Sequence, residues 1–276
     1  MLRETMASIW RALGAHRGGG LKAPVLTYHS VNAHPLDALK PIDPGRLASH
    51  LSHIVSNYKV VSLMDLISAL NGGPALPEKS VVLTFDDGYV DNYTEAFPLL
   101  QRFRVPATFF IPTAYIEGDV DFFPGMVWRP LNWDQITEMA ASDIVTIGAH
   151  GHSHRHFGEM SSLETVDDIA RCRDILTYRL GDTPKLFAYP NGQGYDFEPI
   201  TVQIIRELGF RGACSTFWKT THQNSDCFSL NRIRIDGNDA IPILAAKLRG
   251  DYDYIYHLHR AKALLHRRRT GRGYIK

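Results

Sequence analysis

The 276-residue sequence has few cysteines, almost no net charge and no long apolar run. Its cysteines, Cys172, Cys214 and Cys227, are odd in number and widely spaced, which predicts neither a disulfide framework nor a thiolate zinc site and favours a reducing compartment. The formal net charge of +1 gives no indication of nucleic-acid binding, and no window is apolar enough to span a bilayer. With 44% hydrophobic residues, the chain is long enough for one large globular domain.

The two ends of the sequence carry no clear targeting signal. Charged side chains interrupt the apolar character of residues 1–20, and no small-residue cleavage site follows, so we expect a cytoplasmic protein without a secretory signal. Residues 1–22 are expected to be an N-terminal extension. Residues 266–276 form a basic C-terminal tail, which is either simply solvated or gives at most a peripheral association with anionic lipid.

Short β-rich runs alternate with helical patterns along the chain, without an internal repeat. Strands that alternate with helices predict a parallel sheet, and about seven such units in one domain favour a barrel over an open sheet. The expected strands are 25–28, 81–85, 107–111, 144–147, 185–189, 212–216 and 230–235, and the expected helices are 44–56, 63–70, 91–103, 133–141, 163–178 and 200–208.

Two adjacent carboxylates, Asp86 and Asp87, lie directly after the apolar run at 81–85 and before Gly88. Like charges side by side are unfavourable unless a metal ion or an assigned proton stabilises them. Without further matches, Asp-Asp-Gly is more typical of a surface turn. Metal-ligating residues elsewhere in the sequence would therefore favour a metal site over a surface turn.

Four histidines follow the expected strand at 144–147, and they offer such a partner. His150 and His154 are spaced i, i+4, so on a helical turn they would share a face and converge on one cation. With one carboxylate they would make a three-ligand site of the kind found for catalytic zinc, which leaves the second aspartate for proton transfer. On an extended strand the period of two would place all four on one side, and His152 or His156 would then be ligands instead.

Polar residues follow several of the expected strands at their carboxyl ends. His29 follows the first strand, the acidic pair the second, the histidines the fourth, and residues 189–192 the fifth. In a β/α barrel these ends build the active site. Four segments that are distant in sequence are therefore expected to converge at one mouth.

These motifs are similar to those of the polysaccharide deacetylases, carbohydrate esterase family four or NodB-homology domains. The resemblance covers roughly residues 23–240 and rests on Thr-Phe-Asp-Asp-Gly-Tyr at 84–89 and on His-x-x-x-His at 150–154. It implies a deformed, incomplete (β/α)7 barrel, here assigned to residues 23–265.

The resemblance also implies roles for the site residues. Asp86 would be the catalytic base, and Asp87, His150 and His154 would hold a divalent ion, zinc by ligand type, with nickel or cobalt also suited. The implied activity is the removal of acetyl groups, mainly N-acetyl, from a saccharide substrate. Two alternatives are a metal-dependent amidohydrolase acting on a small non-sugar amide and a catalytically impaired carbohydrate-binding module.

The sequence departs from the family pattern at two motifs. The third motif lacks the usual arginine and tyrosine and resembles instead the Phe-Ala-Tyr-Pro branch at 187–192, where a backbone N–H near Asn191 is expected to stabilise the oxyanion. The Leu-x-His motif of the general acid is not evident, because Leu258-His259 lies in an expected terminal helix. His29 or a metal-bound water is then expected to protonate the leaving amine, and Arg232 and Asp236 are possible supporting partners of the site.

Overall fold

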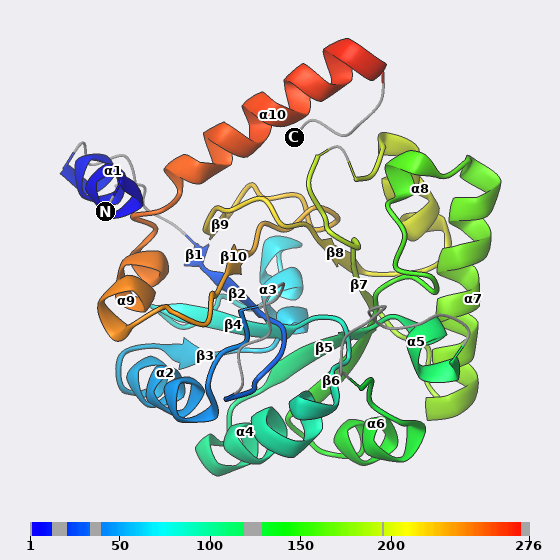
Figure 1. Ribbon diagram of the computed structural model, residues 1–276, viewed down its shortest axis with the longest axis horizontal. Helices are drawn as coiled ribbons and strands as arrows, with labels where there is room; N and C mark the ends of the chain where they lie inside the picture. Colours follow the sequence, from blue (N-terminus) through cyan, green and yellow to red (C-terminus); the bar gives the residue numbers. More distant parts are fainter. Residues whose placement is uncertain (1, 13–20, 34–39, 119–128, 195, 272–276) are drawn as a thin grey trace.

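The centre of the protein is a curled sheet of parallel strands in the order β10-β2-β4-β5-β6-β7-β8 (Figure 1). The structure is a computed structural model that describes residues 2–12, 21–33, 40–118, 129–194 and 196–271. These seven strands are the seven that the sequence predicts, and the predicted incomplete barrel is confirmed. The strands are β2 (Val25–Tyr28), β4 (Ser80–Phe85), β5 (Ala107–Ile111), β6 (Val145–Ala149), β7 (Leu186–Ala188), β8 (Gly212–Cys214) and β10 (Ile233–Arg234), with β3 (Lys59–Val60) beside β4 and a separate antiparallel pair of β1 (Lys22–Ala23) and β9 (Thr221–His222).

The last predicted strand, 230–235, is divided between two neighbours. Leu230 forms a parallel bridge with Cys214 at the end of β8, whereas Ile233 pairs with Leu26 of β2. Between them, the Arg232 N–H donates to the carbonyl of Phe217 at 3.1 Å. This segment therefore connects the two edges of the curled sheet, and only two of its residues remain regular strand.

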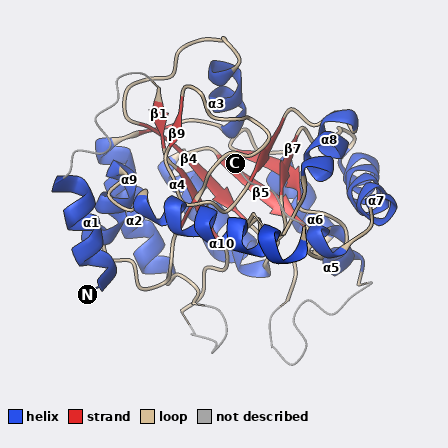
Figure 2. Ribbon diagram, turned by 90° about the horizontal axis from the view of Figure 1, so that it is seen from above, coloured by secondary structure: helices blue, strands red, loops and turns tan. Residues whose placement is uncertain are grey.

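Helices surround the outside of the sheet, as Figure 2 shows from a second direction. Several begin at a residue that caps the free backbone N–H groups of the first turn: Asp43 accepts from Gly45 and Arg46, and Ser62 forms a capping box with Asp65. The helices are α1 (Leu2–Ala12), α2 (Pro44–Asn57), α3 (Leu63–Leu70), the π-helical turn Asn92–Ala96 leading into α4 (Phe97–Phe103), α5 (Thr113–Glu117), α6 (Trp133–Ala140), the 3-10 turn Phe157–Glu159, α7 (Ser162–Leu180), α8 (Pro199–Glu207), α9 (Ile241–Arg249) and α10 (Tyr254–Thr270).

The two faces of the sheet differ in polarity. On the helix-covered face the rings of Tyr28, Phe85 and Phe109 stack, with centroids 5.2 and 4.7 Å apart. On the other face Thr27 lies in register with Thr84 of the neighbouring strand, and the Thr84 hydroxyl donates to the carbonyl of Leu26. The interior of the barrel therefore accepts polar side chains close to the mouth.

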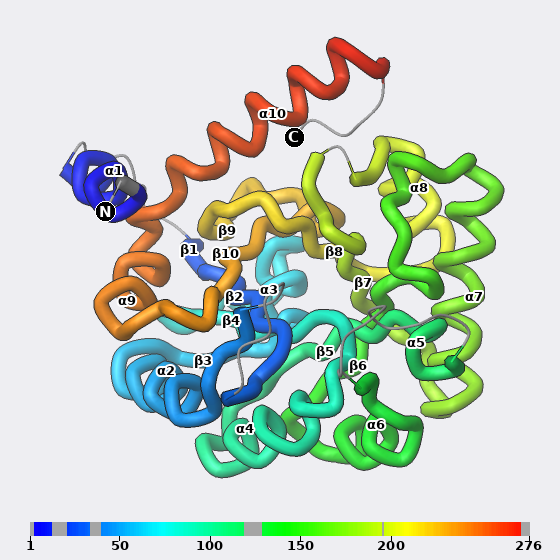
Figure 3. Tube along the Cα trace, in the orientation of Figure 1, coloured from blue at the N-terminus to red at the C-terminus, as the bar shows by residue number. Residues whose placement is uncertain are grey.

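The first helix lies beside the start of the last helix, as the tube in Figure 3 shows. The Trp10 ring is 6.5 Å from that of Tyr254, so helix α1 packs on the domain through this tryptophan. Helix α10 continues to Thr270, and the expected boundary between domain and tail at 265 falls inside it. Within the described residues, no helix combines the length and apolar character needed to cross a bilayer.

Candidate functional site

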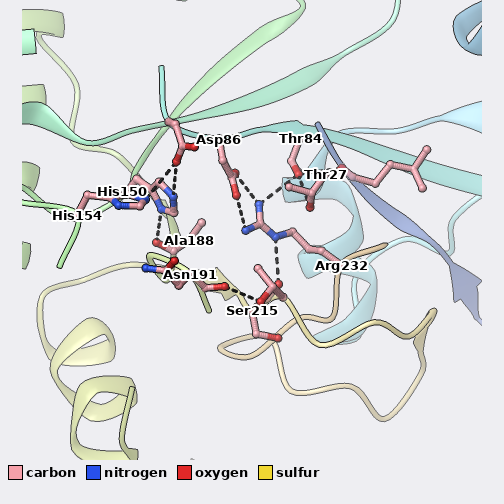
Figure 4. A network of polar contacts seen from close by, with 12 residues as sticks. Thr27, Thr84, Asp86, His150, His154, Ala188, Asn191, Ser215 and Arg232 are labelled. Atoms are coloured by element: carbon pink, nitrogen blue, oxygen red, sulfur yellow. Dashed lines mark hydrogen bonds and ion pairs between the residues drawn. The ribbon is translucent and has the colours of Figure 1, made fainter. Parts of the chain in front are cut away.

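The side chains predicted from the strand ends meet at the mouth of the barrel (Figure 4). Asp86 and Asp87 follow β4, His150 follows β6, and Asn191 comes three residues after β7. Because parallel strands end at the same edge of the barrel, these three segments contribute to one site, and His29 after β2 adds a fourth. The convergence expected from the sequence is present in the structure.

Asp87, His150 and His154 form a cluster whose ligand atoms all lie within 4.8 Å of one another. The Asp87 Oδ1 is 3.1 Å from His154 Nε2 and 3.4 Å from His150 Nε2. Two imidazole nitrogens and one carboxylate oxygen are a donor set of catalytic zinc sites. In the part of the chain that the structure describes, this is the one group of three or more acidic, histidine or cysteine side chains arranged to hold a metal ion.

Neighbouring groups orient the ligands of this cluster. The His150 Nδ1 lies 2.8 Å from the carbonyl of Ala188. A carbonyl only accepts, so this nitrogen carries the proton, and the lone pair of Nε2 points into the cluster. The hydroxyl of Tyr89 donates to the other carboxylate oxygen of Asp87 at 3.0 Å. The residues present therefore fit a divalent ion.

The path of the chain between the two histidines is neither a helical turn nor a strand. Gly151 and His154 are both in the left-handed region, with φ of 73° and 57°. The expectation that the i, i+4 pair converges on a helical turn is therefore wrong, because a tight loop brings the two rings together. Their centroids are 4.9 Å apart.

The other two histidines are turned toward different partners. The His152 Nδ1 lies 2.8 Å from the hydroxyl of Thr113, and the His156 Nδ1 lies 2.7 Å from the carboxylate of Asp196. The alternative in which all four histidines share one side of an extended strand is contradicted, because His150 and His154 face the ligand cluster whereas the other two rings face Thr113 and Asp196.

Unusual backbone conformations concentrate at the site. Of the five described non-glycine residues with positive φ, three are Asp87, His154 and Asn191, with φ of 75°, 57° and 58°. This conformation is unfavourable for a residue with a side chain and persists where the surrounding structure enforces it. The three loops that carry these residues are therefore held in defined shapes.

Asp86 is held by a buried guanidinium. Arg232, 1% exposed, donates from Nη1 and Nη2 to the two oxygens of Asp86, each at 2.7 Å. Burial is the largest single influence and raises the pKa of Asp86, but the charge and hydrogen bonds of Arg232 and the neighbouring histidines together outweigh it and lower the pKa below the ordinary range. The carboxylate is therefore ionised, as a base must be.

The sequence placed Arg232 among possible supporting residues together with Asp236, and only Arg232 reaches the acidic pair. Its Nε also donates to the Ser215 carbonyl at 3.1 Å. Asp236 pairs instead with Arg234, at 3.1 Å. The third motif of this chain lacks the usual arginine. Arg232, just before β10, provides a guanidinium to Asp86 instead.

His29 lies half-buried beside the carboxylates. Its Nδ1 has no hydrogen-bond partner among the described residues. Burial lowers the pKa of His29, and the charges of Asp87 and Asp86 oppose this shift. One ring nitrogen is therefore buried without a hydrogen-bond partner in the described part of the chain.

Asn191 presents its backbone at the same mouth. Its carbonyl accepts from the Thr216 hydroxyl at 2.6 Å, and none of the described residues accepts its backbone N–H. An N–H without a protein partner, on a loop of fixed shape, is available as the oxyanion donor that the sequence predicts.

A cavity of about 610 Å³ lies beside the site, and the acidic pair and the metal-ligand cluster are not among the residues that line it. His29, Asn191 and Arg232 line one part of it, and Trp218 and His259 line another. His259 belongs to helix α10, as expected, and its ring lies edge-on to Trp218 at 6.5 Å. Helix α10 therefore contributes a wall to the cavity, which the sequence did not indicate.

Three buried carboxylates, which the sequence reasoning missed, hold the loops of the site. Asp168 accepts from the N–H groups of His152 and Ser153 at 2.7 and 2.9 Å. Asp91 accepts from Ser30 and from the Val31 N–H next to His29, and Asp196 accepts from the Gln193 N–H after Asn191. One of them could have been found from the sequence: Asp168 falls on the inner, apolar face of a helical pattern. Buried acids are rare unless they are paired, so an acid at such a position indicates a partner.

Comparison with known proteins agrees with these motifs. The family model described as polysaccharide deacetylase matches residues 73–213, just over half of the chain. The poly-β-1,6-N-acetyl-D-glucosamine N-deacetylase of Escherichia coli K12 is 28% identical over an alignment of 188 positions, which covers 56% of this chain but only 28% of that protein.

Solved structures extend the likeness beyond the matched residues. IcaB from Ammonifex degensii is 27% identical, with a TM-score of 0.70 over 84% of this chain and 98% of its own. The Streptococcus pyogenes deacetylase PplD, in complex with acetate, is 24% identical and shares the fold, with a TM-score of 0.73 over 83% of this chain and 99% of its own. The chain belongs to the polysaccharide deacetylase family.

Proposed function

We propose that this protein is a hydrolase that removes N-linked acetyl groups from a saccharide, with a divalent ion held by Asp87, His150 and His154. One observation carries the proposal: an ionised carboxylate, Asp86, stands next to the ligand cluster without belonging to it. A general base is the chemical use of such a group, and a site for binding alone does not need it. The alternative of an impaired binding module is therefore disfavoured.

The ligand atoms suit zinc, and nickel or cobalt fit the same nitrogen and oxygen set. When bound, such an ion acidifies water and polarises the acetyl carbonyl. Asp87 supplies one negative charge and the histidines supply none, so the ligands leave part of the charge of a divalent cation uncompensated.

The protein's own residues divide the proton transfers between them. Asp86 takes the proton of the attacking water, and the two hydrogen bonds from Arg232 fix the orientation of its carboxylate. The backbone N–H of Asn191 donates to the oxygen of the tetrahedral intermediate. His29 donates a proton to the leaving amine, because it lines the cavity together with Arg232, the partner of Asp86.

The substrate class rests on the cavity and on the relatives. A volume of about 610 Å³ is typical of sites for whole small ligands and exceeds the needs of an acetamide group. Because the Escherichia coli relative is named for poly-β-1,6-N-acetyl-D-glucosamine, we propose N-acetylglucosamine oligomers as substrates.

Acetate release measured over a panel of compounds tests this function. The panel contains β-1,6-linked and β-1,4-linked N-acetylglucosamine oligomers, O-acetylated saccharides and small non-sugar amides, each assayed with the zinc-loaded protein. We expect release from the N-acetylated oligomers. Turnover of the small amides alone would favour the amidohydrolase alternative, and no release from any compound by fully metallated protein would contradict the proposal.

A further inference from the structure

Helix α10, which forms one wall of the cavity, has an unusual composition. Its 17 residues span about 25 Å at 1.5 Å per residue, and they include no aspartate or glutamate. Figures 1 and 2 show the helix along the outside of the molecule, beyond the strands. Its lysine and arginine residues are Arg260, Lys262, Arg267, Arg268 and Arg269.

One face of α10 is held by the domain. Tyr254, Ile255 and Tyr256 are buried at its start, and Ala263 is buried two turns later. The Tyr254 hydroxyl donates to the backbone carbonyl of Arg3 at 3.1 Å. The helix is therefore fixed on this face, and its opposite face is directed away from the protein.

The outward face carries a stripe of apolar residues. Leu258, Ala261 and Leu265 are spaced i, i+3 and i+7, so they lie along one line of the helix surface. Leu258 is 56% exposed and Leu265 is 54% exposed. Large leucine side chains on an outer surface are common singly, but Leu258 and Leu265 with Ala261 between them form a continuous apolar stripe.

The cations of α10 flank this stripe and have no acidic partners. None of the five forms an ion pair with a described residue. On a helical projection Lys262 and Arg269 lie on one side of the Leu258–Leu265 line, and Arg268 and Arg260 lie toward the other. An apolar stripe between cations on a helix without acids complements a surface that is anionic outside and apolar beneath.

We propose that the outward face of α10 docks on an anionic phospholipid bilayer, with Leu258 and Leu265 inserted at the interface and the flanking cations on the lipid phosphates. Nucleic acid would satisfy the cations but would leave the leucines in water. A second copy of the chain would cover the leucines but would bring like charges together. In the docked orientation the cavity, lined on the inner side of α10 by Ile255 and His259, opens beside the membrane.

Vesicle co-sedimentation with the full chain tests the proposal without any assay of enzyme activity. We expect binding to phosphatidylglycerol-containing vesicles, weak binding to pure phosphatidylcholine vesicles, and release at high salt. Arg268→Gln with Arg269→Gln should weaken binding roughly 30-fold, since each cation near an anionic surface contributes about five-fold. Leu258→Gln with Leu265→Gln should weaken it at least about ten-fold.

Matched variants elsewhere separate docking from general effects. Leu163 of α7 is 83% exposed, and Lys59 and Arg211 are exposed cations outside α10. Leu163→Gln, and Lys59→Gln with Arg211→Gln, should bind vesicles like the unaltered protein. Equal binding to neutral vesicles, undiminished binding of the α10 variants, or binding to duplex DNA without binding to vesicles would each overturn the proposal.

A second measurement reports insertion directly. The native cysteines are all buried, so a cysteine introduced by Leu258→Cys is the accessible thiol for an environment-sensitive fluorophore. Its emission should shift to the blue on addition of phosphatidylglycerol vesicles, while a label at Leu163→Cys should not respond. A shift that appears with protein concentration and without vesicles would indicate self-association instead, and would overturn the proposal.

Discussion

The mouth of the barrel and helix α10 use the same residue types in opposite surroundings. At the mouth, Arg232 is buried and donates to both oxygens of Asp86, and the histidine rings face defined acceptors. On α10, arginines and leucines are exposed together and acids are absent. At the mouth, a basic side chain keeps one carboxylate ionised. On α10, the basic side chains together give the surface a positive electrostatic potential. Replacing one member of the pair at the mouth should therefore lower the free energy of unfolding, whereas replacing an exposed residue of α10 should leave it nearly unchanged.

The largest expected effect comes from removing two ligands. His150→Ala with His154→Ala should abolish metal binding and, with it, acetate release, because a lone carboxylate is a weak site. Elemental analysis of the purified protein checks this. Stoichiometric metal in this variant would show the ligand assignment to be wrong. His152→Ala is the matched control and should retain the ion, since that ring faces Thr113.

Asp86→Asn should lower deacetylation by roughly 10²–10⁴-fold with metal content near normal, as expected for loss of a general base. The fold should also suffer. Arg232 would be left buried without a charged partner, which costs up to about 3–5 kcal/mol in the free energy of unfolding. Urea titration measures this loss.

Two variants sharpen the Asp86 experiment. Adding Arg232→Met should recover stability without recovering activity, which isolates the pair by a double-mutant comparison. Asp87→Asn should instead weaken metal binding, because a charged ligand becomes neutral. Metal lost with Asp86→Asn and kept with Asp87→Asn would exchange the two roles.

His29→Gln should lower kcat by about 10²-fold, at the lower end for general acid catalysis, with little change in metal content. The half-buried His53 of α2 is the matched control, and His53→Gln should leave kcat unchanged. If kcat of His29→Gln equals that of the unaltered protein, another group protonates the amine.

Asp168→Ala should weaken metal affinity about 10–100-fold, the usual effect of removing a group that orients ligands. The loop of His150 and His154 would lose the acceptor of two backbone N–H groups. Competition with a chelator gives the affinity. Asp167→Ala, on the exposed side of the same helix, should have no effect, and equal affinities for the two variants would remove Asp168 from the site.

The smallest effect concerns Asp253, which is buried next to α10 and accepts from the Thr220 N–H at 3.0 Å. Burial raises its pKa to about 6. A carboxyl whose folded pKa is raised binds its proton more tightly when folded, so its stabilisation is present at low pH and is lost as pH rises through about 6. Unfolding free energy should therefore gain roughly 1 kcal/mol between pH 7.5 and pH 5, and Asp253→Asn should remove this gain. An unchanged pH dependence in the variant would assign it to other groups.

Much of the fold was predictable because its signals are local. The apolar runs before Asp86 and His150 mark strands, and seven of them alternate with helices. The acid pair and the histidines are also local in sequence, and each follows a strand. The tight loop from His150 to His154 was not predictable from spacing, since i, i+4 fits a helical turn equally well and only the left-handed φ at Gly151 and His154 distinguishes the two.

By itself, the sequence determined where the strands lie along the chain, the carboxyl ends at which polar residues gather, and three residues able to hold a metal ion. Those features follow from periodicity and from short motifs. Only the tertiary structure decided that Arg232 lies on Asp86, that Asp168 holds the histidine loop, and that α10 turns its leucines outward. Such contacts join residues as many as 146 positions apart, and their existence depends on how the sheet curls and on which helix face finds a partner, neither of which a local pattern encodes.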